Sequence, residues 1–372
     1  MRVTPRGLRL LVVLAVALLA PVSAASAADP GRWRLTGQSP IPFEYFQGMA
    51  SDPGRHVWFD GVFAGLYRTD DQLRERARQP IEIPPAVTAS RGYNHIGDPT
   101  WDARKGGRVL LPLECYTPGA PGGGNTCGRG AIGVADPLTL QWRYLVELDP
   151  AEIPKAMWAE VSPDGRLVWT SSGDDLLAYR TAAITRAAAA GPPLRAVKRL
   201  AGVVPASGIT GAAFYGDRLL LAGSGPAGFE VSSIDLATGA RRLEIQRPAE
   251  LESEGLDVLD AMGGVLHWIV RPLAGPGNVL LHFAPTAPRG RLRLTARPAA
   301  LADWHRTRVR FRATHAGRPV PGAVVRAAGR WVRTGAAGTA RMTLHLPRSG
   351  HLRVTASRAD LRSAVVTLRA AG

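Results

Sequence analysis

The chain has 372 residues, of which 45% are hydrophobic and 20% charged, and its formal net charge is +16. Hydrophobic content at this level supports packed cores and argues against a disordered chain. The 42 glycines and 30 prolines are spread between short apolar runs, which is typical of an all-β protein with many turns.

The first 27 residues are interpreted as a signal peptide. Three arginines precede the apolar run Leu10–Ala20, and Ala25-Ser26-Ala27 provides small residues for cleavage before Ala28. A membrane anchor is the less favoured alternative, because a spanning helix needs roughly 20 apolar residues. No cysteine stands directly after the apolar run, where a lipid would be attached, and this excludes a lipoprotein anchor. We therefore expect a secreted, extracellular protein, with cell-surface association depending on the rest of the chain.

The positive charge is concentrated at the C-terminal end. Residues 291–372 contain 17 arginines, no lysine and two aspartates, a formal charge of +15, whereas residues 31–290 are nearly neutral. The composition therefore predicts one neutral domain followed by one basic domain. The mature length of about 340 residues agrees with two domains.

Cys115 and Cys127 are the only cysteines. Two cysteines this close in an exported chain are expected to form a disulfide. Closing such a loop would stabilise the fold by roughly 3 kcal/mol. A metal-binding pair and free thiols are the alternatives.

A repeated pattern organises residues 30–288. A short apolar strand, a turn containing Asp or Gly and a second apolar strand recur, starting at Gly48, Ile96, Trp158, Ile209 and Glu254. The spacing is near that of four-stranded propeller blades. The sequence thus predicts a five-bladed β-propeller, with Arg32–Thr36 as the missing outer strand of the last blade; a β-sandwich with insertions is the rival. Asp70–Arg78 is expected to form one or two helical turns.

One blade carries a family resemblance. The segment Ser162–Tyr179, SPDGRLVWTSSGDDLLAY, resembles blades of the YVTN/lactonase-like propellers. The Glu254-Gly255 step is similar to that of gluconolactonase, paraoxonase and phytase-like esterase propellers, where the carboxylate holds a metal in the channel. This resemblance implies a channel site.

Residues 291–372 have a sequence pattern different from that of the repeated region. Arg308–Ala313 alternates apolar and charged side chains, as a half-solvated strand does. GRPVPGAVV from Gly317 and TGAAGTA from Thr334 resemble bacterial Ig-like and carboxypeptidase-regulatory-like sandwiches. The resemblance implies a basic Ig-like β-sandwich that spaces, displays or adheres.

Candidate site residues follow from the propeller geometry, because the first strand of each blade lines the central channel. The predicted channel residues are Gln47, Asn94, Thr210 and Glu252. Glu254, Glu160 and Asp98 are candidate ligands for calcium or another divalent ion. Hydrogen bonding of these groups to backbone and water is the structural alternative.

Two function classes remain open. The favoured one is a non-catalytic propeller that binds an unknown ligand or partner at its mouth, with a basic module for cell-envelope association. The alternative is a Ca²⁺-dependent esterase or lactonase with His95 as general base. Other common catalytic motifs are absent from the sequence.

The outward-facing arginines of the tail are candidate anion-binding residues, because a field of this sign attracts polyanions. The named candidates are Arg308, Arg310, Arg312 and Arg353. A solvated surface is the plainer interpretation. No nucleic-acid partner is expected, since no base-reading element is visible, and we expect a monomer.

Overall fold

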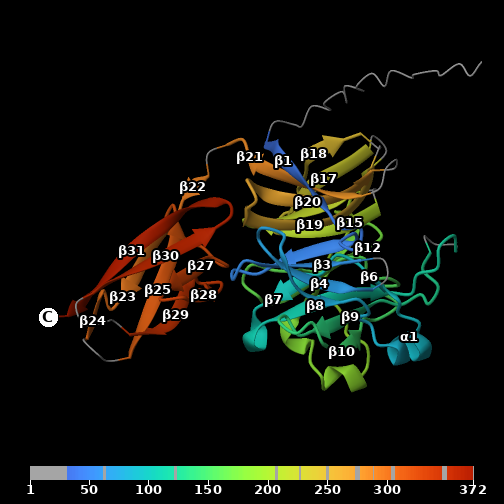
Figure 1. The fold of residues 1–372 in the computed structure, drawn as a ribbon, viewed down its shortest axis with the longest axis horizontal. Coiled ribbons are helices and arrows are strands. Elements are labelled where there is room, and N and C mark those ends of the chain that lie inside the picture. Colours follow the sequence, from blue (N-terminus) through green and yellow to red (C-terminus); the bar gives the residue numbers. More distant parts are fainter. Residues whose placement is uncertain are drawn as a thin grey trace, which may run out of the picture.

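The computed structural model describes residues 32–371, apart from 62–63, 121–123, 206–207, 226–227, 249–250, 273–276, 288, 303–305 and 346–349. The expected signal peptide, residues 1–27, lies outside the described residues. Those that are described form an all-β structure made of antiparallel sheets and one two-sheet unit (Figure 1).

The N-terminal part contains a series of sheets in chain order. The first has the order β2 (Gly48–Ser51), β3 (His56–Asp60), β4 (Leu66–Asp70), β5 (Glu75–Gln79). In the second, β6 (His95–Ile96) and β7 (Thr100–Asp102) both pair with β8 (Arg108–Glu114), followed by β9 (Ala131–Ala135) and β10 (Trp142–Glu147). The third has the order β11 (Glu160–Val161), β12 (Leu167–Ser172), β13 (Asp175–Arg180), β14 (Lys198–Leu200).

Two further sheets complete this part. One has the order β15 (Gly208–Tyr215), β16 (Arg218–Gly225), β17 (Gly228–Asp235), β18 (Arg241–Arg247). The other has the order β19 (Leu251–Ala261), β20 (Gly264–Pro272), β21 (Asn278–Pro285), β1 (Trp33–Ile41). The repeated hairpins expected from the sequence are thus the first two strands of each sheet.

The sheets form a closed ring. The first strand of each sheet contacts the first strand of the next, and β19 contacts β2, which joins the last sheet to the first. Apolar side chains pack between neighbouring sheets, as Trp58 and Leu66 do against Val109. This arrangement is a β-propeller.

The N-terminal strand belongs to the last sheet, as the sequence predicted. β1 pairs with β21 in antiparallel register, from Trp33 opposite Pro285 to Ile41 opposite Asn278. The edge of β21 is therefore covered by a strand from the other end of the propeller sequence, which removes an exposed edge.

The expected helical turns at Asp70–Arg78 are wrong. Residues 75–79 form the outer strand β5, which pairs with β4 across a bulge. An outer strand exposed on both faces lacks the alternation that marks a half-buried strand. A side-chain hydrogen bond also attaches β5 to the propeller: the Tyr45 hydroxyl donates to Glu75 Oε2 at 2.7 Å.

Helices are few among the described residues. The α-helix is α1 (Pro85–Arg91), and the short 3₁₀ helices are Arg104–Gly106, Thr181–Ala183 and Ala188–Ala190. A proline starts α1, and Gly92 ends it at φ 81°. Within the described part of the chain, no helix is long and apolar enough to cross a membrane.

The predicted disulfide is confirmed. Cys115 and Cys127 are bonded and close a loop in the second sheet, after β8. Asn94 holds the start of this loop, because its side chain accepts from Tyr116 N at 2.7 Å and donates to Tyr116 O at 2.8 Å.

Residues 290–371 form two sheets that share one core. One sheet has the order β22 (Gly290–Arg291), β31 (Leu361–Ala371), β30 (His351–Arg358), β27 (Val324–Ala327), β28 (Arg330–Arg333), with β24 (Ala300–Ala302) on β31. The other contains β23 (Arg293–Arg297), β25 (Thr307–His315), β26 (Arg318–Pro319) and β29 (Thr339–Leu344). The expected alternation holds on β25, where Val309, Phe311 and Ala313 are buried and the arginines between them are exposed.

The two-sheet unit lies against the propeller (Figure 1). Trp331 contacts Trp101 with ring centroids 5.4 Å apart, and Arg326 donates to the backbone carbonyl of Pro53. Arg358 Nη1 lies 3.2 Å from Asp217 Oδ1. The contact combines an aromatic pair with ion pairs and hydrogen bonds.

Candidate functional site

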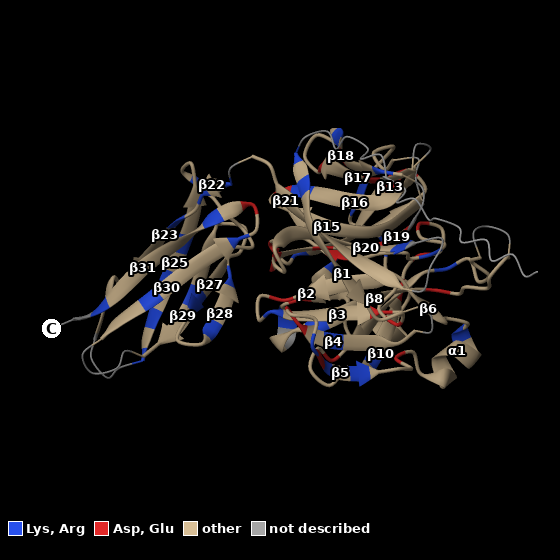
Figure 2. Cartoon of the chain, turned by 45° about the horizontal axis from the view of Figure 1, so that its top comes forward, with Lys and Arg blue, Asp and Glu red and all other residues tan. Residues whose placement is uncertain are grey.

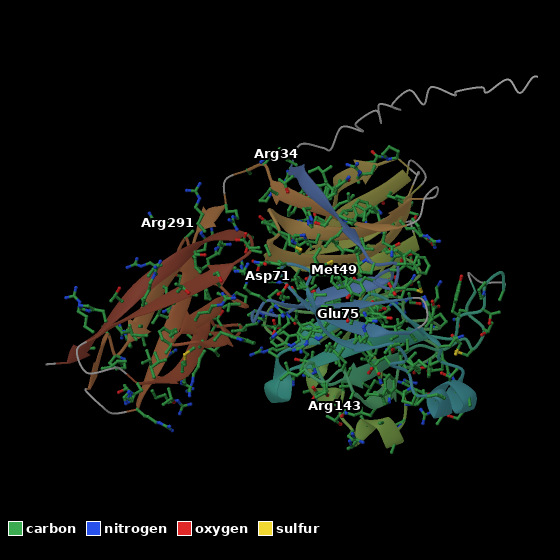
Figure 3. The ribbon with its side chains drawn as sticks, in the orientation of Figure 1. Arg34, Met49, Asp71, Glu75, Arg143 and Arg291 are labelled. Carbon is green, nitrogen blue, oxygen red and sulfur yellow. A yellow bond between two sulfur atoms is a disulfide. The ribbon has the colours of Figure 1, made fainter. Side chains whose placement is uncertain are left out.

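The axis of the propeller is closed by the Asp98 side chain. Its Oδ1 accepts a hydrogen bond from Met49 N at 2.9 Å, and its Oδ2 accepts from Ala212 N at 2.9 Å and Leu256 N at 3.3 Å. Its backbone N–H donates to Met157 O at 2.9 Å. One residue of the second sheet thus bonds to all four other sheets or their connections, and Figure 3 labels Met49 in the middle of the propeller.

Glycines let the axial strands approach each other closely. A Cβ at Gly97 would lie 1.9 Å from Met157 O, and one at Gly255 would lie 2.5 Å from Gly48 Cα. Since real Cβ atoms do not approach so closely, only glycine fits at these positions without a shift. The axis at this level is filled by backbone and by the Asp98 carboxyl group.

Most of the predicted site residues lie on one side of this closure. Gln47 and His95 are buried on the amino side, where the axial strands begin. His95 Nδ1 lies 3.0 Å from Glu114 Oε1, and both side chains are buried. Glu252 is exposed, with its carboxylate 3.7 Å from Arg271 Nη1.

Glu254, Thr210 and Asp60 lie on the same side. Glu254 is 5% exposed, and Thr210 Oγ1 donates to its backbone carbonyl at 3.3 Å. Burial raises the pKa of Glu254, and the nearby carboxyls of Glu252, Asp60 and Asp98 raise it further. Burial also raises the pKa values of Asp60 and Asp98. The sequence did not indicate this cluster. Only the first strand of each blade was expected to line the channel, and Asp60 lies at the end of β3, a second strand.

The three candidate calcium ligands do not point to one place. Both Asp98 oxygens accept backbone hydrogen bonds, whereas Glu160 Oε2 accepts from Thr100 Oγ1 at 2.7 Å and its Oε1 from Phe214 N at 3.3 Å. Across the described residues, no group of three or more His, Cys, Asp or Glu side chains is placed to hold a metal. The calcium site and the hydrolase role of His95 stay predictions.

A cavity lies on the opposite side, where the axial strands end. Its volume is about 540 Å³, and it is bounded by the propeller and by the two-sheet unit. The propeller supplies Thr100, Trp101 and Phe214, and the two-sheet unit supplies Gly322 and Val324. Of the residues predicted to line the channel or hold a metal, Glu160 is the one that lines this cavity.

Acidic and basic side chains line the cavity in equal number. The acidic residues are Asp52, Glu160, Asp257 and Asp260, and the basic residues are Arg55, Arg326, Arg333 and Arg358. Burial raises the pKa of Glu160 to about 8 and that of Asp257 to about 6. Glu160 is therefore largely protonated at neutral pH, whereas Asp257 is mostly ionised.

Arg333 is one of three arginines that the two-sheet unit contributes to the cavity. Its guanidinium lies over the Trp101 ring, 5.1 Å from the centroid. Burial lowers the pKa of Arg333, while the carboxyls of Glu160, Asp52 and Asp257 oppose that shift. In the described structure, Arg333 Nε is buried without a hydrogen-bond partner. Sequence reasoning missed this residue, because nothing local distinguishes it from the other arginines of the tail.

Five exposed arginines of the tail lie on one face of one sheet. Arg310 lies directly opposite Arg297 on β23 and directly opposite Arg341 on β29. The predicted residues Arg308 and Arg312 flank Arg310 on the same face of β25. None of these five is in an ion pair of the described residues, and Figure 2 shows the blue segments along this unit. The fourth candidate, Arg353, is exposed on β30 of the other sheet and lies apart from these five.

Comparisons with known proteins do not assign the chain to a family. No family model matches the chain, and no curated protein matches it. Among solved structures, the chain is similar to the glutaminyl cyclase of Myxococcus xanthus, with 12% identity, 68% of this chain and 97% of that chain covered, and a TM-score of 0.42. It is also similar to the PQQ-bound aldose sugar dehydrogenase of Streptomyces coelicolor, with 11% identity, 69% and 100% covered, and a TM-score of 0.36. Likeness at these scores says nothing about what this chain binds or does.

Proposed function

We propose that this chain is a secreted binding protein, in which a five-bladed propeller is attached to an anionic polymer of the cell envelope by a basic Ig-like domain. The single observation that carries the proposal is the row formed by Arg297, Arg310 and Arg341. The proposal locates polymer binding on the sheet that contains β23, β25 and β29.

The blade count is supported by the ring of contacts. The first strands β2, β7, β11, β15 and β19 succeed one another around the axis, and the ring closes between β19 and β2. Asp98 bonds to the strands or connections of all the other sheets. A sixth blade would separate groups that lie within hydrogen-bond distance.

The Ig-like assignment is supported by the shared core of the last two sheets. Val309 and Phe311 of one sheet pack with Val325 and Val354 of the other. Two antiparallel sheets with alternating inward residues are the usual form of such sandwiches. The resemblance of the segments that start at Gly317 and Thr334 agrees with this assignment.

The arginine row is an unfavourable arrangement for the isolated domain. Like charges directly opposite each other on adjacent strands destabilise a sheet. A polyanion would relieve this repulsion by contacting several guanidinium groups at once, and guanidinium groups bind phosphate, sulfate and carboxylate in bidentate fashion. The face is suited to a repeating anionic polymer.

Retention on matched columns of dextran sulfate and uncharged dextran tests this function. The full mature chain should be retained on dextran sulfate at low salt and released as salt screens the attraction. The triple variant R297Q/R310Q/R341Q should elute at clearly lower salt. A control with the same change in net charge replaces three exposed propeller arginines, Arg104, Arg180 and Arg241.

Equal elution of the two triple variants would show that net charge alone causes retention and would reject the arginine row. Equal retention of the native chain on both columns would reject anion binding altogether. Both variants alter exposed side chains, so neither should unfold at a lower midpoint than the native chain, and R297Q/R310Q/R341Q should be at least as stable because it removes the repulsion within the row.

A further inference from the structure

We infer that the cavity at the carboxyl ends of the axial strands binds a neutral polyhydroxylated molecule of sugar size. The inference rests on the propeller acting as the ligand-binding part of the proposed protein. The cavity volume of about 540 Å³ lies within the range of small-molecule sites. The ligand class follows from the charges, the unpartnered atoms and the apolar surfaces of the lining.

The charge of the lining favours a ligand without net charge. Several of the lining groups are already engaged by neighbours: Arg358 lies against Asp360 and Asp217, and Asp260 lies 2.7 Å from Arg289 Nη1. Glu160, Asp257 and Arg333 belong to none of the ion pairs within the described structure. A ligand with a strong charge of either sign would meet a like charge among them.

A buried donor and a buried acceptor of this lining lack partners. Arg333 Nε is a donor, Asp257 Oδ2 is an acceptor, and neither has a hydrogen-bond partner among the described residues. An unpaired buried polar atom costs free energy, so a group that pairs with it gains affinity. A hydroxyl group donates to a carboxylate and accepts from a guanidinium with the same oxygen atom. Both residues line the cavity, but these two atoms have less than 1 Å² of accessible surface, so a molecule with several hydroxyl groups pairs with them when the two side chains turn toward it.

Apolar surfaces lie next to these polar groups. The side chains of Trp101, Phe214 and Val258 line the same cavity. A sugar ring presents C–H groups on its faces and hydroxyls at its rim, so it matches a lining that alternates aromatic and charged groups. An aliphatic ligand would leave the polar atoms unpaired, and a small ion would leave the apolar surfaces without contact.

The test uses calorimetric titration of the full mature chain with glucose, N-acetylglucosamine and maltose, and with the charged analogues glucuronate and glucosamine. We expect at least one neutral sugar to bind at millimolar concentration or below. The charged analogues should bind more weakly than glucose. Quenching of tryptophan fluorescence should accompany binding, because Trp101 lines the cavity.

The variants R333Q and D257N should each lower the affinity about tenfold, since each removes a charged hydrogen-bonding partner. The control R330Q alters an exposed arginine on the same strand as Arg333 and should leave the affinity unchanged. Unfolding curves of all three variants identify any that fail to fold. R333Q changes the two-sheet unit and D257N changes the propeller, so one can replace the other.

The inference is overturned if no neutral sugar binds at millimolar concentration, if the charged analogues bind more tightly, or if R330Q loses as much affinity as R333Q. Its failure is distinguishable from failure of the proposed function. R333Q should keep its retention on dextran sulfate, because Arg333 faces the cavity and the arginine row lies on the other sheet.

Discussion

The carboxylate of Asp98 accepts a hydrogen bond from the backbone N–H of Ala212 at 2.9 Å, although the two residues are 114 positions apart in the chain. Similar bonds from Met49 and Leu256 bring three separate strands to one side chain. Asp98 is therefore the group through which the axial strands are held together, and its carboxyl group and the backbone around it occupy the axis at this level.

The substitution Asp98→Ala should destabilise the protein by about 3 kcal/mol or more, because three buried N–H groups lose their acceptor. Urea unfolding measures the change. The control Asp174→Ala, at an exposed turn, should stay within about 0.5 kcal/mol of the native protein. Equal effects of the two substitutions would contradict a structural role for Asp98.

The substitution Gly97→Ala should prevent normal folding or lower the unfolding free energy by several kcal/mol. Its Cβ would lie 1.9 Å from a backbone oxygen, which side-chain movement cannot relieve. Gly208→Ala is the matched control, because a Cβ there meets nothing within 4 Å. Circular dichroism and urea unfolding distinguish the two, and a stable Gly97→Ala protein would show that the axis is wider than described.

The substitution Arg108→Met should cost about 3–5 kcal/mol of stability by leaving Asp102 as a buried unpaired charge. The two side chains are 2.7 Å apart, and Arg108 also donates to the Thr181 carbonyl at 2.9 Å. Arg104→Met, at an exposed position nearby, is the control for loss of one positive charge. A loss below about 1 kcal/mol would mean that the pair adds little to stability.

The substitution Glu82→Gln should change how stability depends on pH. Glu82 is 1% exposed, and burial raises its pKa from 4.5 to about 9. The folded state then holds a proton that the unfolded state releases, so stability falls as pH rises between these two values. The advantage of Glu82→Gln over the native chain should therefore grow with pH, by at most about 1.4 kcal/mol per unit.

Urea unfolding at about pH 5 and about pH 8 measures this difference. The native chain should lose more stability between the two conditions than Glu82→Gln does. Parallel behaviour of the two proteins would mean that Glu82 is not kept protonated by burial.

The local features of the fold could be predicted from the sequence, because they depend on neighbouring residues. The alternation at Arg308–Ala313, the hairpins and the closing strand after Arg32 all have short-range signals. The strand at residues 75–79 was mistaken for helical turns, since it is exposed on both faces. Its pairing with β4 depends on contacts that no local pattern shows.

The candidate site was harder to predict, because it depends on which side of the axis a residue faces. Glu160 and Glu254 both occupy first strands, but they lie on opposite sides of Asp98 along the propeller axis. The role of Gly97 requires knowledge of Met157, and that of Arg333 requires knowledge of how the last two sheets meet the propeller. These are long-range relationships between segments that are each unremarkable alone.

The two-sheet unit lies over the carboxyl ends of the axial strands and forms one wall of the cavity. A Cβ at Gly216 would lie 3.7 Å from Asp360 Cβ, within the range of disulfide-bonded cysteines, about 3.5–4.5 Å. The double variant Gly216→Cys/Asp360→Cys tests the claim, with Gly173→Cys/Asp360→Cys as control, because Gly173 also has positive φ but meets nothing within 4 Å.

Mass spectrometry of unreduced peptides after mild oxidation is the deciding measurement. A peptide pair joining positions 216 and 360 within one molecule should form in most of the protein, and the control pair should stay unlinked. Free thiols at both positions, or equal cross-linking in the control, would contradict this placement of the two-sheet unit.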